Sequence, residues 1–231
     1  MIITDILPID KKRSKVYIDE EYAFPLYLGE MRRYKIKVGE EITEEVYDEI
    51  LNKVIDKRCK LRAMNILKKV DKTEKQLRDK LKQGFYPEDT IDNTIEYLKS
   101  YRYIDDSRYA DSYVEYRMKN KSKKQVVNEL LQKGIDKEQA LESIPDDYDE
   151  LEAIRNLIAK KKYNDETADI NERRKMYQYL LRKGFNYNDI SHIIHDSDYR
   201  ENWYIFLCNL NKNQIIHKKH RKMLVIKVEK C

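Results

Sequence analysis

The sequence contains little glycine. Its 231 residues include five glycines, and no two of them lie closer than ten residues apart. A Walker A loop, a dinucleotide-binding GxGxxG turn and a GxSxG nucleophile elbow each need two or more glycines within about eight positions. The enzyme classes that depend on these loops are therefore excluded.

Cysteine and long apolar runs are also scarce. Cys59, Cys208 and Cys231 lie far apart, so they form neither a CxxC zinc cluster nor a disulfide framework. No stretch approaches the roughly 18 consecutive apolar residues of a membrane span. Asp5 and Asp10 stand where a signal peptide would carry lysine. We therefore expect a soluble, cytoplasmic protein with no membrane partner.

Charge and tyrosine are abundant. Charged residues make up 39% of the chain, hydrophobic residues 41%, and there are 19 tyrosines, which together are typical of a helical globular protein. The net charge is +5, and most of the excess lies in residues 196–231, which hold eight basic and four acidic residues. Locally basic stretches favour a nucleic-acid or nucleoprotein partner. A solvated lysine-rich surface is the simpler explanation.

Three of the five glycines recur with a period of fifty residues. Gly84, Gly134 and Gly184 each follow a leucine by three positions and precede an apolar residue. The matching residues are Leu81, Leu131 and Leu181 before the glycine, Phe85, Ile135 and Phe185 after it, and Leu77, Val127 and Tyr177 seven positions before it. We predict that each glycine ends the same kind of helix by adopting the left-handed conformation.

Capping residues mark where these helices begin. Thr73 with Gln76, and Ser122 with Gln125, form capping boxes, and Asn171 is the expected cap in the third copy. Further helices are expected before each capped helix, at about 56–70, 106–120 and 150–163, and after each glycine, starting near Pro87, Asp136 and Asn188. The predicted fold is mainly α, with three tandem three-helix repeats in an elongated curved array.

The first forty residues have a different pattern. Val16–Ile18 and the apolar alternation over 22–28 and 34–38 predict a small strand-rich domain. Thr43 is expected to cap a long helix that leads into the first repeat. The predicted domains are 1–42 (strand-rich), 43–104 (linking helix and first repeat), 105–149 (second repeat), 150–196 (third repeat) and 197–231 (basic tail).

Two clusters of polar and aromatic residues need an explanation. Tyr109, Tyr113 and Tyr116 share a helical face, and Tyr97 and Tyr101 lie one turn apart; we favour packing over base stacking for these rings. The neighbouring Asp105–Asp106 pair is better explained as a helix cap than as paired acid–base catalysts, because adjacent side chains on a helix diverge.

Several cations lie at helix starts, where the helix dipole disfavours them by about 0.3–1 kcal/mol each. An anionic partner would make this placement favourable, because backbone N–H groups and side chains would meet the same phosphate. Solvated lysines remain the alternative. Cations near helix ends, Lys68, Lys69 and Lys160–Lys162, need no functional explanation. The hypothetical contact residues for DNA or a filament are Lys123, Lys124, Arg173, Arg174, Lys175, Arg182 and Lys183.

The histidines do not predict a metal site. His192 and His195, and His217 and His220, form two pairs spaced by three, but no third and fourth ligands follow at suitable spacing. We expect no metal and no cofactor.

The junction of the first two repeats contains the run Tyr103–Ala110, followed by Ser112, Tyr113 and Arg117. The repeats themselves contain the segments Ala63–Leu67, Thr73–Leu77, Gly84–Phe85, Glu129–Ile135 and Leu181–Phe185. Together these residues resemble the RecX family of recombination regulators. The junction motif comprises Tyr103, Asp105, Asp106, Arg108, Tyr109, Ala110 and Arg117. Family members usually have glycine where this chain has Arg102. The resemblance therefore does not predict the conformation of the turn at this position. The tail from Asp196 onward matches nothing in the family.

The resemblance implies a non-enzymatic protein that binds the RecA recombinase filament on single-stranded DNA. Such a regulator would restrain the ATP hydrolysis and strand exchange of the filament, in homologous recombination, DNA repair and the SOS response. Separately, we expect a monomer, because the strand-rich front could cover one end of the repeat array. Two other functions stay open. A basic helical array would bind nucleic acid without a recombinase, and a metal-dependent nuclease would lose its turnover in a chelator.

Overall fold

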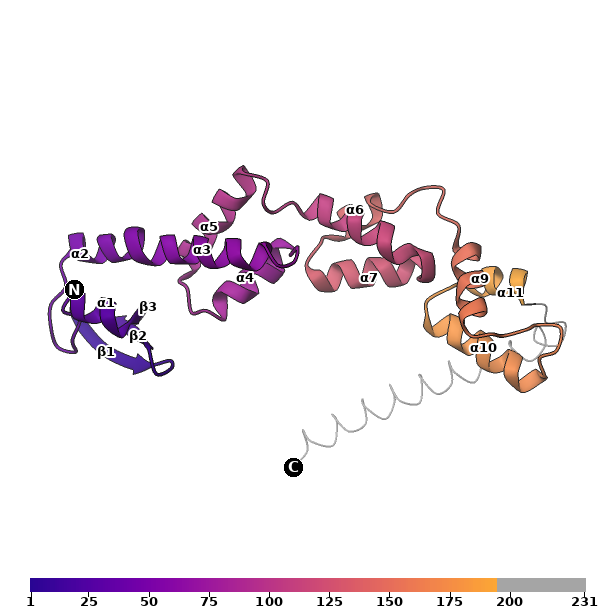
Figure 1. The fold of residues 1–231 in the computed structure, drawn as a ribbon, viewed down its shortest axis with the longest axis horizontal. Coiled ribbons are helices and arrows are strands. Elements are labelled where there is room, and N and C mark those ends of the chain that lie inside the picture. The colour runs from indigo at the N-terminus through magenta and orange to yellow at the C-terminus, as the bar shows by residue number, and fades with distance from the viewer. Residues whose placement is uncertain (195–231) are drawn as a thin grey trace, which may run out of the picture. The chain divides into compact units, whose positions relative to one another are not determined.

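The computed structural model describes residues 1–194, which form two compact units (Figure 1). The first unit contains Met1–Lys119 and Lys123–Tyr148, and the second contains Asn120–Ser122 and the described residues from Asp149 onward. The predicted basic tail, 197–231, lies outside the described residues. Within 1–194, no helix is long and apolar enough to cross a membrane.

The chain begins with a three-stranded antiparallel sheet. Strands β1 (Ile3–Pro8), β2 (Arg13–Ile18) and β3 (Glu21–Tyr27) pair in the order β1-β2-β3. Val16 on the central strand faces Ile6 on one side and the buried Phe24 on the other. Pro25 is tolerated because β3 is an edge strand. The predicted strand-rich domain is confirmed.

The prediction of a strand at 34–38 is wrong. Helix α1 (Leu28–Arg33) occupies the preceding residues, and the N–H groups of Tyr34 and Ile36 donate to the carbonyls of Glu30 and Met31, both at 2.9 Å. Lys35 between them has a φ of +54°. The apolar residues here close the end of a helix, so their backbone groups are not available to a strand.

A long helix joins the sheet to the first repeat, as predicted. The Thr43 hydroxyl accepts from the Val46 N–H and starts α2 (Glu44–Glu49), which continues through the π-helical stretch Ile50–Ile55 into α3 (Asp56–Leu67) without a break (Figure 1). Ile50 and Ile55 are fully buried in the same apolar core as the sheet residues. The sheet and the first repeat therefore share their packing.

Three repeats of three helices follow, which confirms the predicted fold class; the domain boundaries stay a prediction. Each repeat buries its own apolar core. The first repeat comprises α3, α4 (Glu74–Lys82) and α5 (Glu88–Ser100). The second comprises α6 (Asp106–Arg117, extended by a 3-10 turn Met118–Asn120), α7 (Lys123–Lys133) and α8 (Lys137–Glu142). The third comprises α9 (Glu150–Lys160), α10 (Ile170–Arg182) and α11 (Tyr187–Ile193).

Most helix starts are where the sequence predicts them. Thr73 forms a capping box with Gln76, and Asp136 caps α8. The third repeat is an exception, because Asp169 and Glu172 form the capping box of α10 and Asn171 lies inside the helix. Smaller shifts place Asn186 at the start of α11 in place of Asn188, and Pro87 at the N-cap of α5.

The repeated glycines have two different structural roles. Gly134 (φ +95°) and Gly184 (φ +89°) adopt the predicted left-handed conformation. In the first repeat the left-handed residue is Phe85 (φ +63°), so the prediction for Gly84 is wrong. A Cβ on Gly84 would lie 2.9 Å from the Tyr86 ring and 3.0 Å from the Leu81 carbonyl oxygen. Gly84 is needed for close packing.

Capping residues also hold the first repeat to the second. The buried Thr73 hydroxyl donates to the Lys133 carbonyl at 2.5 Å, and the Asp106 carboxylate accepts from the Glu74 N–H at 2.9 Å. Next to Lys133, a Cβ on Gly134 would overlap the side chain of Lys75. In the second unit, the buried Ser122 hydroxyl donates in the same way to the Lys183 carbonyl at 2.8 Å.

We expect the substitution Thr73→Val to lower the free energy of unfolding by about 1–3 kcal/mol, because it removes the cap of α4 and leaves the Lys133 carbonyl without its donor. Thr73→Ser keeps the hydroxyl and is the matched control, with a loss of about 1 kcal/mol or less for the missing methyl group. Chemical denaturation of both variants measures the difference. Equal stability of the two would contradict the role assigned to the hydroxyl.

We expect Gly134→Ala to destabilise the protein by at least about 1–2 kcal/mol, since alanine is strained at positive φ and its methyl group would overlap Lys75. Gly29→Ala is the control, because a Cβ there meets no atom within 4 Å and the site is helical. That change should be neutral or stabilising by up to about 1 kcal/mol. Thermal melts of the two variants should move in different directions; parallel shifts would argue against the packing role of Gly134.

Candidate nucleic-acid interface

A groove lies where the first repeat meets the second. Its volume is about 610 Å³, and its walls come from the α3–α4 loop, the α5–α6 connection, one face of α6 and the end of α7. We call it the junction groove. It is lined by Val70, Asp71, Lys72, Tyr103, Asp105, Arg108, Tyr109, Ser112, Tyr113, Tyr116, Arg117 and Lys133.

Stacked tyrosines form one wall of the junction groove. The rings of Tyr109 and Tyr113 lie 6.1 Å apart between centroids, with an interplanar angle of 14°. The Tyr113 hydroxyl donates to the Glu129 carboxylate on α7 at 2.5 Å. Burial, together with Glu129, raises the pKa of Tyr113 to about 12. The phenol therefore stays protonated at neutral pH and fixes the ring in place.

Cations lie over the faces of these rings. The Lys133 ammonium is 5.1 Å from the Tyr113 centroid and 5.9 Å from that of Tyr109. The Arg117 guanidinium lies 5.5 Å from Tyr113 and 5.4 Å from Tyr116. These distances are within the range of attractive cation–π contacts. The groove therefore combines aromatic faces with positive charge.

The junction motif divides into structural and exposed members. Asp105 caps α6 by accepting from the Arg108 N–H, Asp106 caps α4, and Ala110 is fully buried. Burial raises the pKa of Asp106. Arg108, Tyr103 and Arg117 are exposed to solvent. The motif thus builds the junction and leaves three side chains free to meet a partner.

Arg102 adopts the backbone conformation that glycine would adopt at this position. Its φ is +54°, and the next residue, Tyr103, donates its N–H to the Leu98 carbonyl at 2.8 Å. The chain therefore makes the left-handed turn that a glycine makes without strain, and Arg102 makes it at some energetic cost.

A second groove lies in the third repeat, within the second unit. It has a volume of about 660 Å³, and its lining includes four cations. They come from two segments whose proximity cannot be inferred from their spacing in the sequence. Lys161 and Lys162 follow α9, while Lys175 and Arg182 lie on α10. The Lys161 ammonium lies 5.0 Å from the Tyr179 ring centroid. We call this the third-repeat groove; the remaining lining residues are Tyr163, Asn164, Thr167, Ala168, Glu172, Met176 and Tyr179.

The cations predicted from helix starts have different surroundings. Lys123 and Lys124 do open α7, and Lys124 is exposed. Because α10 begins at Ile170, the run 173–175 lies beyond its first turn, and the dipole argument does not apply there. The Arg173 guanidinium donates to the Asp165 carbonyl at 2.8 Å, so it organises the loop before α10.

The remaining predicted cations lie on or near α10. Arg174 is exposed, and the Lys183 ammonium lies 5.8 Å from the Tyr179 ring centroid. Lys175 and Arg182 line the third-repeat groove together with Lys161 and Lys162. From the sequence, the latter two are ordinary helix-end cations with no predicted function. The proximity of these four cations depends on how α9 packs against the other helices of the third repeat, which spacing along the chain does not reveal.

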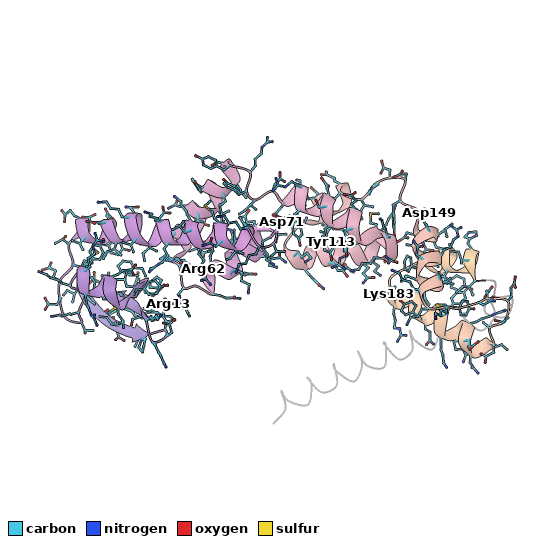
Figure 2. The ribbon with its side chains drawn as sticks, viewed as in Figure 1. Arg13, Arg62, Asp71, Tyr113, Asp149 and Lys183 are labelled. Carbon is cyan, nitrogen blue, oxygen red and sulfur yellow. The ribbon has the colours of Figure 1, made fainter. Side chains whose placement is uncertain are left out.

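A third basic hollow, of about 410 Å³, lies between the sheet and α3. Its lining includes Arg13, Arg58, Arg62 and Lys69 with Tyr27 and Tyr86. Arg58 is committed to the fold, since it pairs with Glu30 at 2.9 Å and donates to the Pro25 carbonyl at 2.6 Å. Arg62 is exposed on α3 (Figure 2). No sequence pattern predicts this site, because Arg13, Pro25 and Tyr27 come from the sheet and most of the other lining residues come from α3.

Over residues 1–194, no group of three His, Cys, Asp or Glu side chains is placed to hold a metal ion. His192 lies on α11. His195, His217 and His220 lie outside the described residues.

The fold defines a tandem three-helix repeat protein with basic, tyrosine-lined grooves. Comparison with known families matches three consecutive domains: the first three-helix domain of RecX at 59–98, the second at 105–143 and the third at 147–194. The Regulatory protein RecX of Caldanaerobacter subterraneus is 35% identical over 195 residues, covering 82% of this chain and 96% of that protein. That of Clostridium beijerinckii is 34% identical over 190 residues, covering 80% and 89%.

Solved structures agree. A crystal structure of RecX from Lactobacillus salivarius is 29% identical, with a TM-score of 0.51, over 60% of this chain and 94% of that one. A crystal structure of another regulatory protein RecX, 23% identical, shares the fold with a TM-score of 0.54 over 85% and 99%. The chain belongs to the RecX family of regulatory proteins, as the junction motif predicted.

If the third-repeat groove contacts phosphates, replacement of Lys161, Lys162, Lys175 and Arg182 by alanine will weaken binding to single-stranded DNA. The salt dependence, as a log–log slope, should fall by about 0.7 for each phosphate that the variant no longer neutralises. The double variant Lys124→Ala/Arg174→Ala tests the exposed cations outside the groove, where we expect a smaller change.

The control for this experiment removes four other exposed cations, Arg32, Lys53, Lys57 and Lys80, none of which lines a groove. Fluorescence anisotropy at several salt concentrations gives affinity and slope for each variant. The assignment fails if the groove variant and this control lose the same affinity and the same slope.

Proposed function

We propose that this protein binds the RecA recombinase filament on single-stranded DNA and restrains its ATP hydrolysis and strand exchange. The observation that carries the proposal is membership of the RecX regulatory family through all three repeats. The protein then regulates homologous recombination, DNA repair and the SOS response from the cytoplasm.

The grooves support such a partner. The junction groove and the third-repeat groove both present cations beside tyrosine rings, a combination suited to a nucleoprotein that carries phosphates and bases. The protein would act as a monomer by binding and without turnover, so it changes the rate of a reaction that the recombinase performs. No metal or cofactor takes part in this proposal.

A second candidate is a nucleic-acid-binding protein that acts without a recombinase. The same grooves favour it, because their chemistry fits a single strand alone as well as one coated by protein. The two candidates differ in whether the effect requires the recombinase.

The deciding experiment titrates this protein into the single-strand-dependent ATPase of the cognate recombinase, at fixed DNA and two salt concentrations. We expect suppression of ATP hydrolysis at or below stoichiometric ratios. Co-sedimentation should also detect the protein on filaments assembled beforehand with a non-hydrolysable nucleotide. The third-repeat groove variant should suppress ATP hydrolysis less than the wild-type protein, because we expect it to bind more weakly.

An unchanged ATPase rate at saturating protein, together with binding to bare DNA, would contradict the filament proposal and support the second candidate. Suppression that arises because this protein displaces the recombinase from limiting DNA would also contradict the filament proposal and support the second candidate. Excess DNA distinguishes the two mechanisms. Suppression of the ATPase that arises from competition for DNA should disappear when DNA is in excess, whereas suppression by a filament-bound regulator should remain.

A further inference from the structure

We propose that the junction groove is a binding site for single-stranded nucleic acid, in which bases stack on Tyr103 and Tyr116 while Arg117 and Arg108 contact the phosphates. The inference rests on the proposed function and deepens it by assigning the residues that meet the strand.

The first observation is the exposure of aromatic rings inside a concave site. Tyr116 is 75% exposed and Tyr103 is 49% exposed, although both line the same groove. Tyr109 and Tyr113 beside them are half-buried and stacked. Scattered exposed apolar residues are ordinary. Two open rings next to a stacked pair, in one groove, are a platform on which further rings can stack.

The second observation is how the groove holds its cations. Lys72, Arg108, Arg117 and Lys133 line it, and within the described residues none of them forms an ion pair with a carboxylate. Arg117 lies over two tyrosine rings, which position its guanidinium and leave its charge unneutralised. The acidic residues of the groove are Asp71 and Asp105, and Asp105 already accepts from the Arg108 N–H at 3.0 Å.

The third observation is that neighbouring side chains already position most of the groove's rings in the absence of a ligand. Glu129 fixes the Tyr113 hydroxyl, Lys133 lies over the stacked pair, and Tyr103 is backed by Tyr101 at 6.3 Å between ring centroids. Bases that stack here would therefore not have to order these side chains, which removes part of the entropic cost of binding.

Among anionic partners, these features select a single-stranded nucleic acid. An acidic peptide would use the four cations and leave the tyrosine faces unused. A double helix buries the faces of its bases, so it could not stack on exposed rings. Proteins that bind single strands combine a cationic groove with aromatic platforms. The volume of about 610 Å³ lies within the range of about 300–1,000 Å³ typical of sites for a small ligand, which leaves room for a nucleoside.

The test measures binding of an end-labelled oligothymidylate to the full chain by fluorescence anisotropy, without recombinase. The double variant Tyr103→Ala/Tyr116→Ala should bind about tenfold or more weakly, and Tyr103→Phe/Tyr116→Phe should keep wild-type affinity because phenylalanine still stacks. Arg117→Ala should lower the log–log salt slope by about 0.7. Ile170→Ala, at an exposed apolar side chain outside the three grooves, and Arg32→Ala are the controls.

Photocrosslinking supplies a readout that does not depend on affinity. An oligonucleotide carrying iododeoxyuridine should crosslink to Tyr103 or Tyr116, identified by mass spectrometry of the digested complex. Circular dichroism melts confirm that the variants fold, which is expected because both side chains are exposed.

Three outcomes overturn the inference. They are wild-type affinity of the double alanine variant, crosslinks that all map outside the groove, and an alanine variant that binds DNA normally but no longer associates with filaments. The last result would assign the groove to a surface of the recombinase and leave the proposed function intact. Loss of DNA binding in the alanine variant, together with no effect of the wild-type protein on the ATPase, would support the groove and reject the filament function.

Discussion

The packing of the first unit depends on the Thr73 hydroxyl, which takes part in two hydrogen bonds at once. Thr73 accepts from the Gln76 N–H at the start of α4 and donates its own proton to the Lys133 carbonyl at the end of α7. One fully buried atom therefore satisfies backbone groups at a helix start and at a helix end that are sixty residues apart. An unsatisfied buried group would cost about 1–3 kcal/mol, so the two helix ends are held together. Ser122 donates to the Lys183 carbonyl in the second unit, which explains why a small hydroxyl residue and a glycine recur with nearly the same separation.

This contact also determines where the junction groove can form. The Lys133 carbonyl must reach Thr73, and Gly134 has no side chain that would keep the α7 end away from Lys75. Asp106 adds a second tie by capping α4 from the second repeat. With both ends fixed, the Lys133 side chain lies over the Tyr109–Tyr113 pair. The geometry of the candidate site is thus a consequence of helix capping, and changes to the caps would alter the groove without touching its lining.

Local sequence patterns predicted the features that depend on neighbouring residues. Capping boxes, helical spacing and glycine period gave the three-helix repeat, and the Tyr103–Arg117 motif gave the family. The errors arise where a residue's conformation depends on a distant or competing partner. The pattern predicts Asn171 as the cap of α10, although Asp169 and Glu172 form a complete capping box. It also predicts a left-handed Gly84, whereas Phe85 adopts that conformation. Residues 34–38 alternate like a strand, yet the end of α1 uses their N–H groups. The grooves themselves could not be predicted, because Lys161 and Arg182 line the same groove only after α9 and α10 have each packed against α11.

The tyrosine content links the fold to the proposed chemistry. A cation paired with a carboxylate is positioned but neutralised, as Arg173 is by Asp165 and Arg58 by Glu30. A cation over an aromatic ring is positioned by about 0.5–1 kcal/mol at an exposed site, and it keeps its full charge for an outside anion. Arg117 and Lys133 in the junction groove, and Lys161 in the third-repeat groove, are held in this second way. Phenylalanine could hold a cation too, but the phenol adds a hydroxyl that can be anchored, as Glu129 anchors Tyr113. A chain with 19 tyrosines and four phenylalanines can therefore orient positive charge without cancelling it, which is what a protein with a net charge of only +5 needs in order to bind a polyanion.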